Sequence, residues 1–385
     1  MQPKHNALLC GLLLLALPLV FSFTPRRTAS TTRPPAPKIQ VAILLDVSSS
    51  MDGLIDQAKA QLWNLVGLLG RAECDRGTPQ VEIALYEYGR TSNDAAQGYV
   101  KRIHSFTREL DSLSKSLFAL NTNGGEEYCP QVIYTSVQDL PWDSDPKTYK
   151  ALFIAGNESF RQGSLTWEKA CAAARAKGIV VNTIYCGDKA EGIREFWNLN
   201  AECGSGSYSN INSNAQAEDI PTPYDSALYT LNDQFNVTMV GYGVRGRAAG
   251  VQVAEVDRIN YEHNKASAAA RATVKAQRGL YNNASWDIVD AYEADSNFHK
   301  TVDRSSLPDS LQQKTAAQLK VVIERKRAER DQVRGQIAEI SRKRGEWLTE
   351  ERKRRATRGA EEATLESEME KVLKVQVQRN GFVIK

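Results

Sequence analysis

An aspartate and two serines at alternate positions are the first residues of this sequence whose types and spacing could do chemistry. Asp46, Ser48 and Ser50 follow the apolar run 41–45 in the stretch VAILLDVSSSMDG. Alternate residues of an extended loop point the same way, so one carboxylate and two hydroxyls converge. Such an all-oxygen site suits a hard cation, Mg²⁺ or Mn²⁺. The alternative is that Ser50 or Asp52 simply caps the helix that follows, although a cap needs only one such residue.

These side chains need buried strands beneath them, and the chain supplies several. Four apolar, β-branched runs are typical of strands that are buried on both faces. They are residues 41–46, 81–88, 149–156 and 179–187. Helical patterns lie between them, including apolar positions three and four residues apart within 52–70. The alternation predicts an α/β fold with a doubly wound, mostly parallel sheet, in which binding sites lie beyond the carboxyl ends of the strands.

The motif DVSSS, after an apolar strand and before an amphipathic helix, resembles the Asp-x-Ser-x-Ser signature of von Willebrand factor A (VWA) domains. The resemblance covers residues 39–235. It implies a doubly wound sheet with a metal-ion-dependent adhesion site at its top. In that family the Asp and both Ser hydroxyls hold a metal, usually with a Thr and a second Asp from later loops. A carboxylate of the partner is the last ligand.

Two later loops of this chain depart from the family pattern. Where the family has Gly-Gly-x-Thr, the stretch NTNGGEEYCPQ keeps both glycines but places Glu126 or Glu127 at the Thr. Where the family has Thr-Asp-Gly, the expected Asp is missing, and Asn157 or Glu158 would have to substitute for it. We therefore expect a partly degenerate site with Glu126 or Glu127 as an added metal ligand. The alternative is a retained fold whose site has lost its metal.

Five cysteines follow the N-terminal apolar run, and their spacings match no zinc module. Export would permit disulfide bonds. Cys186 ends a predicted strand and Cys203 follows the next helix, so both are expected near the top of the sheet as disulfide candidates. Cys74 and Cys129 fall in predicted loops and are further candidates. Cys171 lies in a predicted helix and is expected to be a buried free thiol, although spacing alone does not fix the connectivity.

The N-terminal part is typical of a targeting segment rather than of a folded domain. Residues 1–23 combine a short start, which carries Lys4 and His5, with a continuous apolar run, and this pattern predicts a signal peptide. The alternative is an uncleaved membrane anchor. Residues 24–38 are rich in Pro, Thr and Arg and are predicted to form a linker. We expect an exported protein, periplasmic or extracellular.

Beyond residue 235 the composition changes, and we expect an α-helical C-terminal region. The Ala-rich residues 236–300 predict a helical segment, and residues 301–385 contain a long charged helix. Lys and Arg interrupt its apolar spacing, whereas a coiled coil needs sustained apolar positions. We expect a helical hairpin or a loose coiled coil that permits self-association, with a helix folded back on its own domain as the alternative. Its basic residues would allow contact with an anionic envelope surface.

Composition and motifs argue against nucleic-acid binding and against catalysis. A net charge of +3 over 385 residues gives no general attraction for nucleic acid. The histidines are few and scattered, and neither H-E-x-x-H nor G-x-S-x-G occurs. The sequence therefore predicts a non-enzymatic, adhesion-type protein of the cell envelope that binds a protein partner. We expect an acidic side chain of that partner to make the contact. The alternative is a metal-independent structural scaffold assembled through the charged C-terminal helix.

Overall fold

The computed structural model describes residues 36–75, 77–212, 220–356 and 364–384. The predicted signal peptide 1–23 and nearly all of the predicted linker 24–38 lie outside these described residues. In the described part of the chain, no helix combines the length and the apolar character that crossing a bilayer requires.

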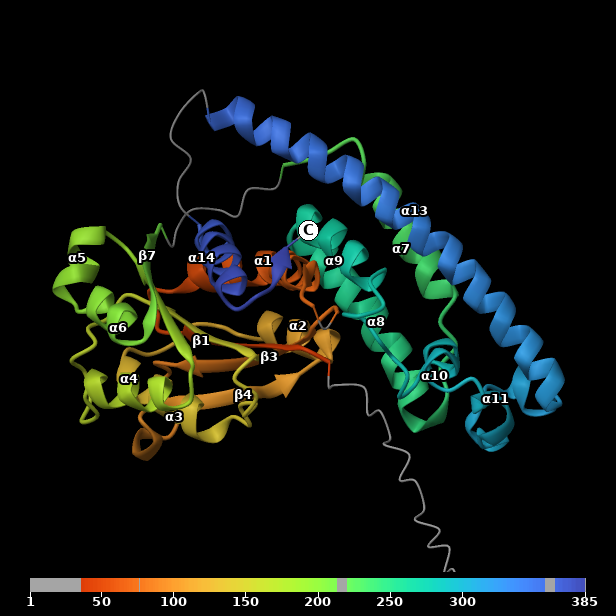
Figure 1. Ribbon diagram of the computed structural model, residues 1–385, viewed down its shortest axis with the longest axis horizontal. Coiled ribbons are helices and arrows are strands. Elements are labelled where there is room, and N and C mark those ends of the chain that lie inside the picture. Colours follow the sequence, from red (N-terminus) through yellow and green to blue (C-terminus); the bar gives the residue numbers. More distant parts are fainter. Residues whose placement is uncertain (1–35, 76, 213–219, 357–363, 385) are drawn as a thin grey trace, which may run out of the picture. The chain divides into compact units, whose positions relative to one another are not determined.

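A six-stranded, mostly parallel sheet has the strand order β4-β3-β1-β5-β6-β7 (Figure 1). Its strands are β1 (Lys38–Asp46), β3 (Gln80–Tyr88), β4 (Val100–Thr107), β5 (Tyr149–Gly156), β6 (Val180–Cys186) and β7 (Ser205–Ile211). All neighbours pair in parallel except β4, which runs antiparallel to β3 at the edge. Because the order grows outward from β1 in both directions, the predicted doubly wound sheet is confirmed.

Helices cover both faces of this sheet, as parallel strands that are buried on both sides require (Figure 1). The helices of the first half of the chain are α1 (Asp52–Gly70), α2 (Leu110–Phe118), α3 (Cys129–Asp139), α4 (Trp167–Ala176), α5 (Lys189–Arg194) and α6 (Trp197–Cys203). One apolar core lies under α1 and α2, and a second lies under α3 and α4. The apolar spacing within 52–70 predicted α1, whose inward face is buried.

The predicted α-helical C-terminal region is confirmed. It contains α7 (Asp225–Val237), α8 (Gly243–His263), α9 (Lys265–Lys275), α10 (Ile288–Ala294), α11 (Phe298–Thr301), α12 (Asp309–Gln312), α13 (Ala316–Ala356) and α14 (Leu365–Arg379). Short 3₁₀ turns span Ala95–Gln97 and Arg304–Ser306. A small antiparallel pair joins β2 (Ala72–Glu73) to β8 (Val383–Ile384).

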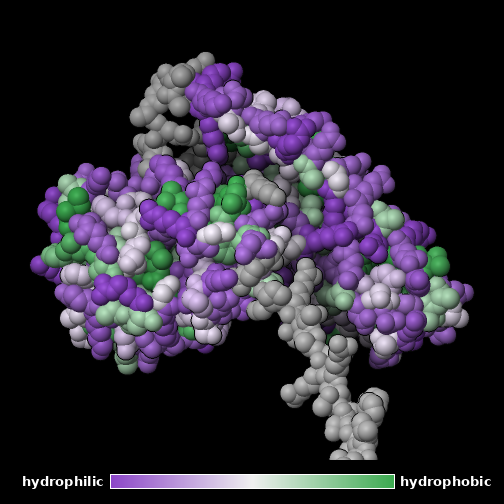
Figure 2. Space-filling model, in the orientation of Figure 1, coloured by the Kyte–Doolittle hydropathy of each residue, from purple (hydrophilic) through white to green (hydrophobic). Residues whose placement is uncertain are grey.

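The long charged helix α13 packs on its own chain. Its apolar residues Leu319 and Ile323 join a core with α10, and Val333 and Ile337 join a core with α7 and α9. Figure 2 shows a mostly hydrophilic surface over the visible side of α13. The structure therefore has the folded-back helix, and the expected hairpin or loose coiled coil is wrong for the described residues. The interruptions in the apolar spacing arise because charged side chains such as Arg330 are also buried in this packing.

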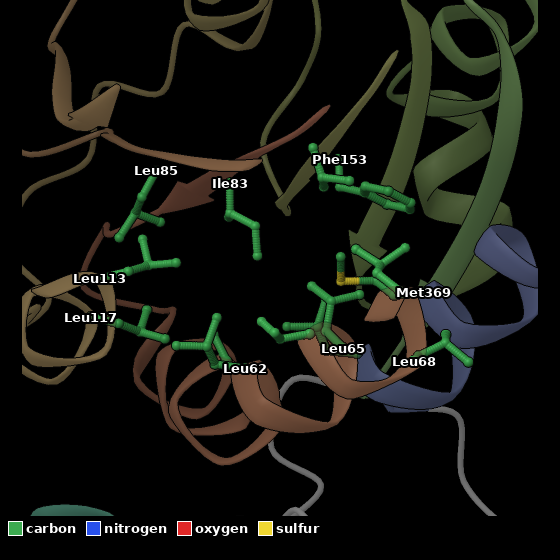
Figure 3. Close-up of a cluster of buried hydrophobic side chains, with 14 of the residues drawn as sticks. Leu62, Leu65, Leu68, Ile83, Leu85, Leu113, Leu117, Phe153 and Met369 are labelled. Carbon is green, nitrogen blue, oxygen red and sulfur yellow. The ribbon is translucent and has the colours of Figure 1, made fainter. Parts of the chain in front are cut away.

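The expected boundary at residue 235 does not separate two cores. Leu373 and Val377 of α14 are buried in the core beneath α1, and Figure 3 shows Met369 of the same helix beside the leucines of α1. The Tyr149 hydroxyl of β5 donates a hydrogen bond to Gln376 Oε1 at 2.7 Å. Residues 36–385 accordingly form one compact unit. Helix α14 lies far along the chain but completes the sheet domain, because its apolar face covers part of the core that α1 and α2 do not cover.

Candidate metal centre

Three loops meet beyond the carboxyl ends of β1, β3 and β5. Asp46 is the last residue of β1 and lies level with Tyr88 of the parallel strand β3. The second loop, residues 121–128, precedes α3, and the third begins at Asn157, directly after β5. This is the edge at which doubly wound sheets place their binding sites.

Ser49, the middle serine of the DVSSS motif, ties the first two loops together. Its N–H donates to Gly124 O at 3.2 Å, and Gly124 N–H donates to Ser49 Oγ at 3.2 Å. Asn123 N–H also donates to Val47 O at 2.8 Å. Gly124 has a φ of 106°, and a Cβ there would lie 2.5 Å from Thr91 N, so only glycine fits. The sequence analysis missed this role of Ser49.

Asp46 is fully buried and only half satisfied. Its Oδ1 accepts the Ser48 N–H at 2.8 Å, whereas Oδ2 is buried without a hydrogen-bond partner. The Ser48 and Ser50 hydroxyl oxygens lie 3.3 Å apart. Asn157 Nδ2 donates to Ser50 Oγ at 3.3 Å, and Asn157 Oδ1 is buried without a partner. The structure thus brings four predicted site residues together and leaves two buried oxygens unsatisfied, which a native fold rarely tolerates without a ligand.

The helix-capping alternative is wrong for these serines. Helix α1 begins at Asp52, and Met51 stands at its N-cap without any side-chain capping bond. Asp52 lies in the first helical turn, and its Oδ1 accepts a hydrogen bond from the Thr122 hydroxyl. The hydroxyls of Ser48 and Ser50 are therefore left for a different role.

Glu127, and not Glu126, lies beside Asp46. The Glu127 side chain is only 3% exposed. A Cβ built on Gly89 would lie 3.0 Å from both Asp46 Oδ1 and Glu127 Cγ, so the two acidic side chains flank one point. Glu126 is exposed, and its carboxylate accepts from the Tyr128 hydroxyl at 3.4 Å. Of the two expected glutamates, Glu127 therefore has the position of an added ligand.

The site carries negative charge without a basic partner. Burial raises the pKa of Asp46 to about 7; hydrogen bonds from Ser48 oppose the shift, and the Glu127 and Glu158 carboxylates add to it. Burial likewise raises the pKa of Glu127 to about 7, and Glu158 and Glu126 add to that shift. The charged neighbours that contribute most to these two pKa shifts are acidic. A divalent cation would supply the missing positive charge.

A neutral, closely packed layer lies beneath Asp46. A Cβ on Gly156 would lie 2.4 Å from the Tyr88 hydroxyl oxygen and 2.9 Å from Asp46 Oδ2, so glycine is required at the end of β5. The thiols of Cys129 and Cys186 are buried here, and burial raises the pKa of each well above its usual value. Neither thiol supplies a charge to the site.

The cysteine expectations are wrong in part. Cys171 of α4 and Cys203 of α6 form a disulfide, with Cα atoms 5.8 Å apart. Cys74, Cys129 and Cys186 are free thiols in the structure. Helices α4 and α6 pack side by side, which brings Cys171 to Cys203, whereas Cys186 lies buried at the end of β6.

The donor set fits a hard divalent cation. Within the described ranges, no cluster of three or more His, Cys, Asp or Glu side chains is placed to hold a metal. The set beyond β1 is of another kind, with the carboxylates of Asp46 and Glu127, the hydroxyls of Ser48 and Ser50, and the amide oxygen of Asn157. Oxygen donors of this mixture are those that Mg²⁺ and Mn²⁺ prefer in proteins.

The fold of this chain is similar to that of several solved structures. No protein-family model matches the chain, and no curated protein matches it. Among solved structures, proximal thread matrix protein 1 from the mussel byssus is 13% identical over 46% of this chain and 42% of its own, with a TM-score of 0.34. The SpRpn10 VWA domain is 12% identical over 45% of this chain and 88% of its own, with a TM-score of 0.34. BatB from Bacteroides thetaiotaomicron is 15% identical over 57% of this chain and 99% of its own, with a TM-score of 0.34.

The fold is of the VWA type. The strand order, the strand directions and the Asp-x-Ser-x-Ser loop at the end of β1 carry this conclusion. This chain spans less than half the length of the mussel protein, one structure of which is described as having a zinc-occupied metal-ion-dependent adhesion site. The VWA-type domain here includes α14 and β8 from the far end of the chain.

Proposed function

We propose that this chain is a non-enzymatic binding protein whose VWA-type domain holds Mg²⁺ or Mn²⁺ and uses it to bind a protein partner. The observation that carries the proposal is the state of Asp46, which is fully buried with one carboxylate oxygen unpartnered. An ionised carboxylate in such a place is costly unless an opposite charge accompanies it. The neighbouring hydroxyl and amide oxygens support a metal as that charge.

Each residue has a distinct role in this proposal. Asp46 supplies buried negative charge, and Ser48 and Ser50 supply neutral oxygens. Asn157, whose Nδ2 donates to Ser50, has a buried amide oxygen without a partner that would serve as a further ligand. Glu127 supplies the second carboxylate. Ser49 holds the loops in register through Gly124. When bound, the metal supplies a positively charged centre that fixes the three loops for recognition.

The surroundings of the serines support binding rather than catalysis. A nucleophilic serine needs a general base within hydrogen-bond reach. His104 hydrogen-bonds Ser116 at 2.7 Å, and His263 lies 3.3 Å from Asp56 O. Neither histidine contacts the serines of the candidate site, and we assign the neighbouring carboxylates of Asp46 and Glu127 to the metal. We accordingly propose no reaction at this site.

We further propose that the protein is exported. The apolar run within residues 1–23 supports this part of the proposal. N-terminal sequencing of the mature protein should give a chain that begins after about residue 23. A mature chain that begins at Met1 in the cytoplasm would contradict it, and a chain that begins at Met1 in the membrane fraction would indicate an uncleaved anchor.

Self-association through the charged helix has less support. The buried apolar positions of α13 pack within the chain, against α7, α9 and α10, and Val321 is exposed. The metal-independent scaffold would therefore have little apolar surface on this helix with which to assemble.

Calorimetric titration tests the metal site. Mg²⁺ and Mn²⁺ should bind the wild-type protein with a Kd below about 1 mM, and Asp46→Asn should abolish binding because it removes the buried charge. Asp52→Asn is the matched control, since Asp52 is close in sequence but bonds Thr122 outside the donor set. Absence of heat from the wild type at millimolar metal would overturn the proposal.

A further inference from the structure

The rim of the candidate metal centre carries more negative charge than a divalent cation neutralises. Asp46 and Glu127 flank the same point beside Gly89. Glu126 precedes Glu127 on the same loop, and Glu158 lies on the loop after β5. Beneath this cluster, Asp46 Oδ2 beside Gly156 and the neighbouring Asn157 Oδ1 are buried without hydrogen-bond partners. Four carboxylates against two positive charges leave an excess of negative charge at the surface.

The nearby basic side chains are engaged elsewhere. Arg90 Nε lies 3.1 Å from Glu87 Oε1 and its Nη1 donates to Asn121, while Lys101 lies 3.8 Å from the same Glu87. Arg161 follows Glu158 closely in sequence, but its guanidinium lies over the Phe196 ring at 4.0 Å. None of these contacts joins a basic group to the carboxylates of the metal site.

Glu127 supplies from within the chain the carboxylate that the VWA resemblance assigns to a partner. Its side chain is held in the site by burial and by the loop that Ser49 fixes through Gly124. An incoming carboxylate would meet Glu127 and its acidic neighbours at short range, and like charges repel across such a contact. An acidic partner is therefore disfavoured by the residues of this chain.

Two tyrosines stand beside the acidic rim. The rings of Tyr99 and Tyr128 pack edge to face with centroids 5.5 Å apart, and the Tyr128 hydroxyl donates to Glu126. Tyr99 has a φ of 57°, in the left-handed region that L residues seldom adopt, so the fold holds this ring in place at a conformational cost. Aromatic rings next to carboxylates form a surface that attracts ammonium and guanidinium groups.

We infer that the partner of this site presents a lysine or arginine side chain, and not an aspartate or glutamate. The basic group would lie between the carboxylates of Glu126 and Glu158 and the edge of the Tyr99–Tyr128 pair. The inference rests on the proposed function, since the cation is expected to order these loops. It names the chemical class of the partner that the loops bind.

Peptide binding at saturating Mg²⁺ tests the inference on the full chain. The probes are fluorescent oligolysine and oligoglutamate peptides of equal length, followed by anisotropy. We expect the wild type to bind oligolysine and to leave oligoglutamate unbound. Glu158→Gln should weaken oligolysine binding by about three-fold, as expected for one partly exposed ion pair. Glu202→Gln, on the exposed side of α6, should leave it unchanged.

Glu127 offers the sharper variant. Glu127→Thr restores the residue of the VWA pattern and should permit oligoglutamate binding, whereas Glu127→Gln keeps the shape and should only weaken oligolysine binding. Thermal melting checks that each variant is folded. Equal or tighter binding of oligoglutamate by the wild type, or binding of neither peptide, would overturn the inference. Failure of the proposed function is separate, because it shows as absent Mg²⁺ binding in calorimetry.

Discussion

A carboxylate at the end of β1 and those of the C-terminal helices have opposite surroundings. In the C-terminal helices, Asp257 Oδ1 accepts from Arg271 Nε at 2.5 Å, and Lys275 Nζ lies 3.0 Å from Asp257 Oδ2. Burial acts to raise the pKa of Asp257, but Lys275 and Arg271 hold this pKa well below its usual range. At the end of β1, burial raises the pKa of Asp46 to about 7, and the Glu127 and Glu158 carboxylates add to the shift.

A second cluster in the helices repeats the paired arrangement. Arg330 is 1% exposed, and its Nη1 donates to Asp287 at 2.5 Å and to Asp290 at 2.7 Å. Its remaining groups donate to the side chain and the carbonyl of Thr238. A network satisfied in this way specifies the packing of helices. Burial alone therefore does not indicate that a carboxylate is functional. A buried carboxylate that has no basic side chain to pair with is the better indicator.

The strongest way to break this comparison is to remove Arg330. Arg330→Met would leave Asp287 and Asp290 buried without their cation, and the free energy of unfolding should fall by about 3–5 kcal/mol. Denaturant unfolding monitored by circular dichroism measures the change. Arg342→Met is the control, because Arg342 forms an exposed pair with Glu346 and should matter little. Equal losses in the two variants would contradict a structural role for the network.

Asp257→Asn tests the same region from the acidic side. The substitution keeps the shape of the side chain but leaves Arg271 and Lys275 with less compensating charge in a buried place. The free energy of unfolding should fall by about 3 kcal/mol, somewhat less than for Arg330→Met because Arg271 keeps its pair with Asp111. Denaturant unfolding at neutral pH gives the value. A stabilised variant would show that the pairing does not offset the desolvation of Asp257.

Asp46→Asn should have the opposite sign when metal is removed by a chelator. Because the folded pKa of Asp46 is raised above its unfolded value, ionisation costs stability as pH rises from about 4 to about 7. The variant cannot ionise, so at pH 8 it should be more stable than the wild type by about 4 kcal/mol. At pH 4 the two proteins should be equal. If the variant is less stable than the wild type at pH 8, a positive charge must lie near Asp46, and the structure does not show one.

Metal affinity should depend on pH over the same range. A metal ligand must be deprotonated, and the pKa values of Asp46 and Glu127 are both about 7. Because both carboxylates must be ionised, the affinity for Mg²⁺ should fall about 30-fold, or by about 2 kcal/mol, between pH 7 and pH 6. Calorimetric titration at the two pH values measures it. An affinity independent of pH would indicate that neither carboxylate contacts the ion.

The sequence predicted the central strands and α1 because each is a continuous apolar run or a regular apolar spacing. It did not reveal β4, whose outward residues are exposed on an edge strand, or β7, a polar strand of Ser, Gly and Asn. It missed α14 as part of the sheet domain, since an amphipathic helix does not show which distant face it covers.

The same limit explains the outcome at the candidate site. Asp46, Ser48 and Ser50 are close in sequence, so their convergence could be predicted from one loop. The burial of Asp46, the choice of Glu127 over Glu126 and the contribution of Glu158 depend on how three loops from different strands meet. The Cys171–Cys203 bond likewise depends on the packing of α4 against α6.

The antiparallel pair β2–β8 and the seating of α14 have a consequence for biogenesis. Ala72 pairs with Ile384, and Gln376 bonds Tyr149 across 227 residues of chain. The first strands leave the ribosome long before the segment that covers them, and a sheet assembled from such remote parts folds slowly. Until α14 has been synthesised, the part of the apolar surface of α1 that it covers lies open to water. Nascent chains of this protein should therefore depend on a chaperone that binds exposed apolar helices.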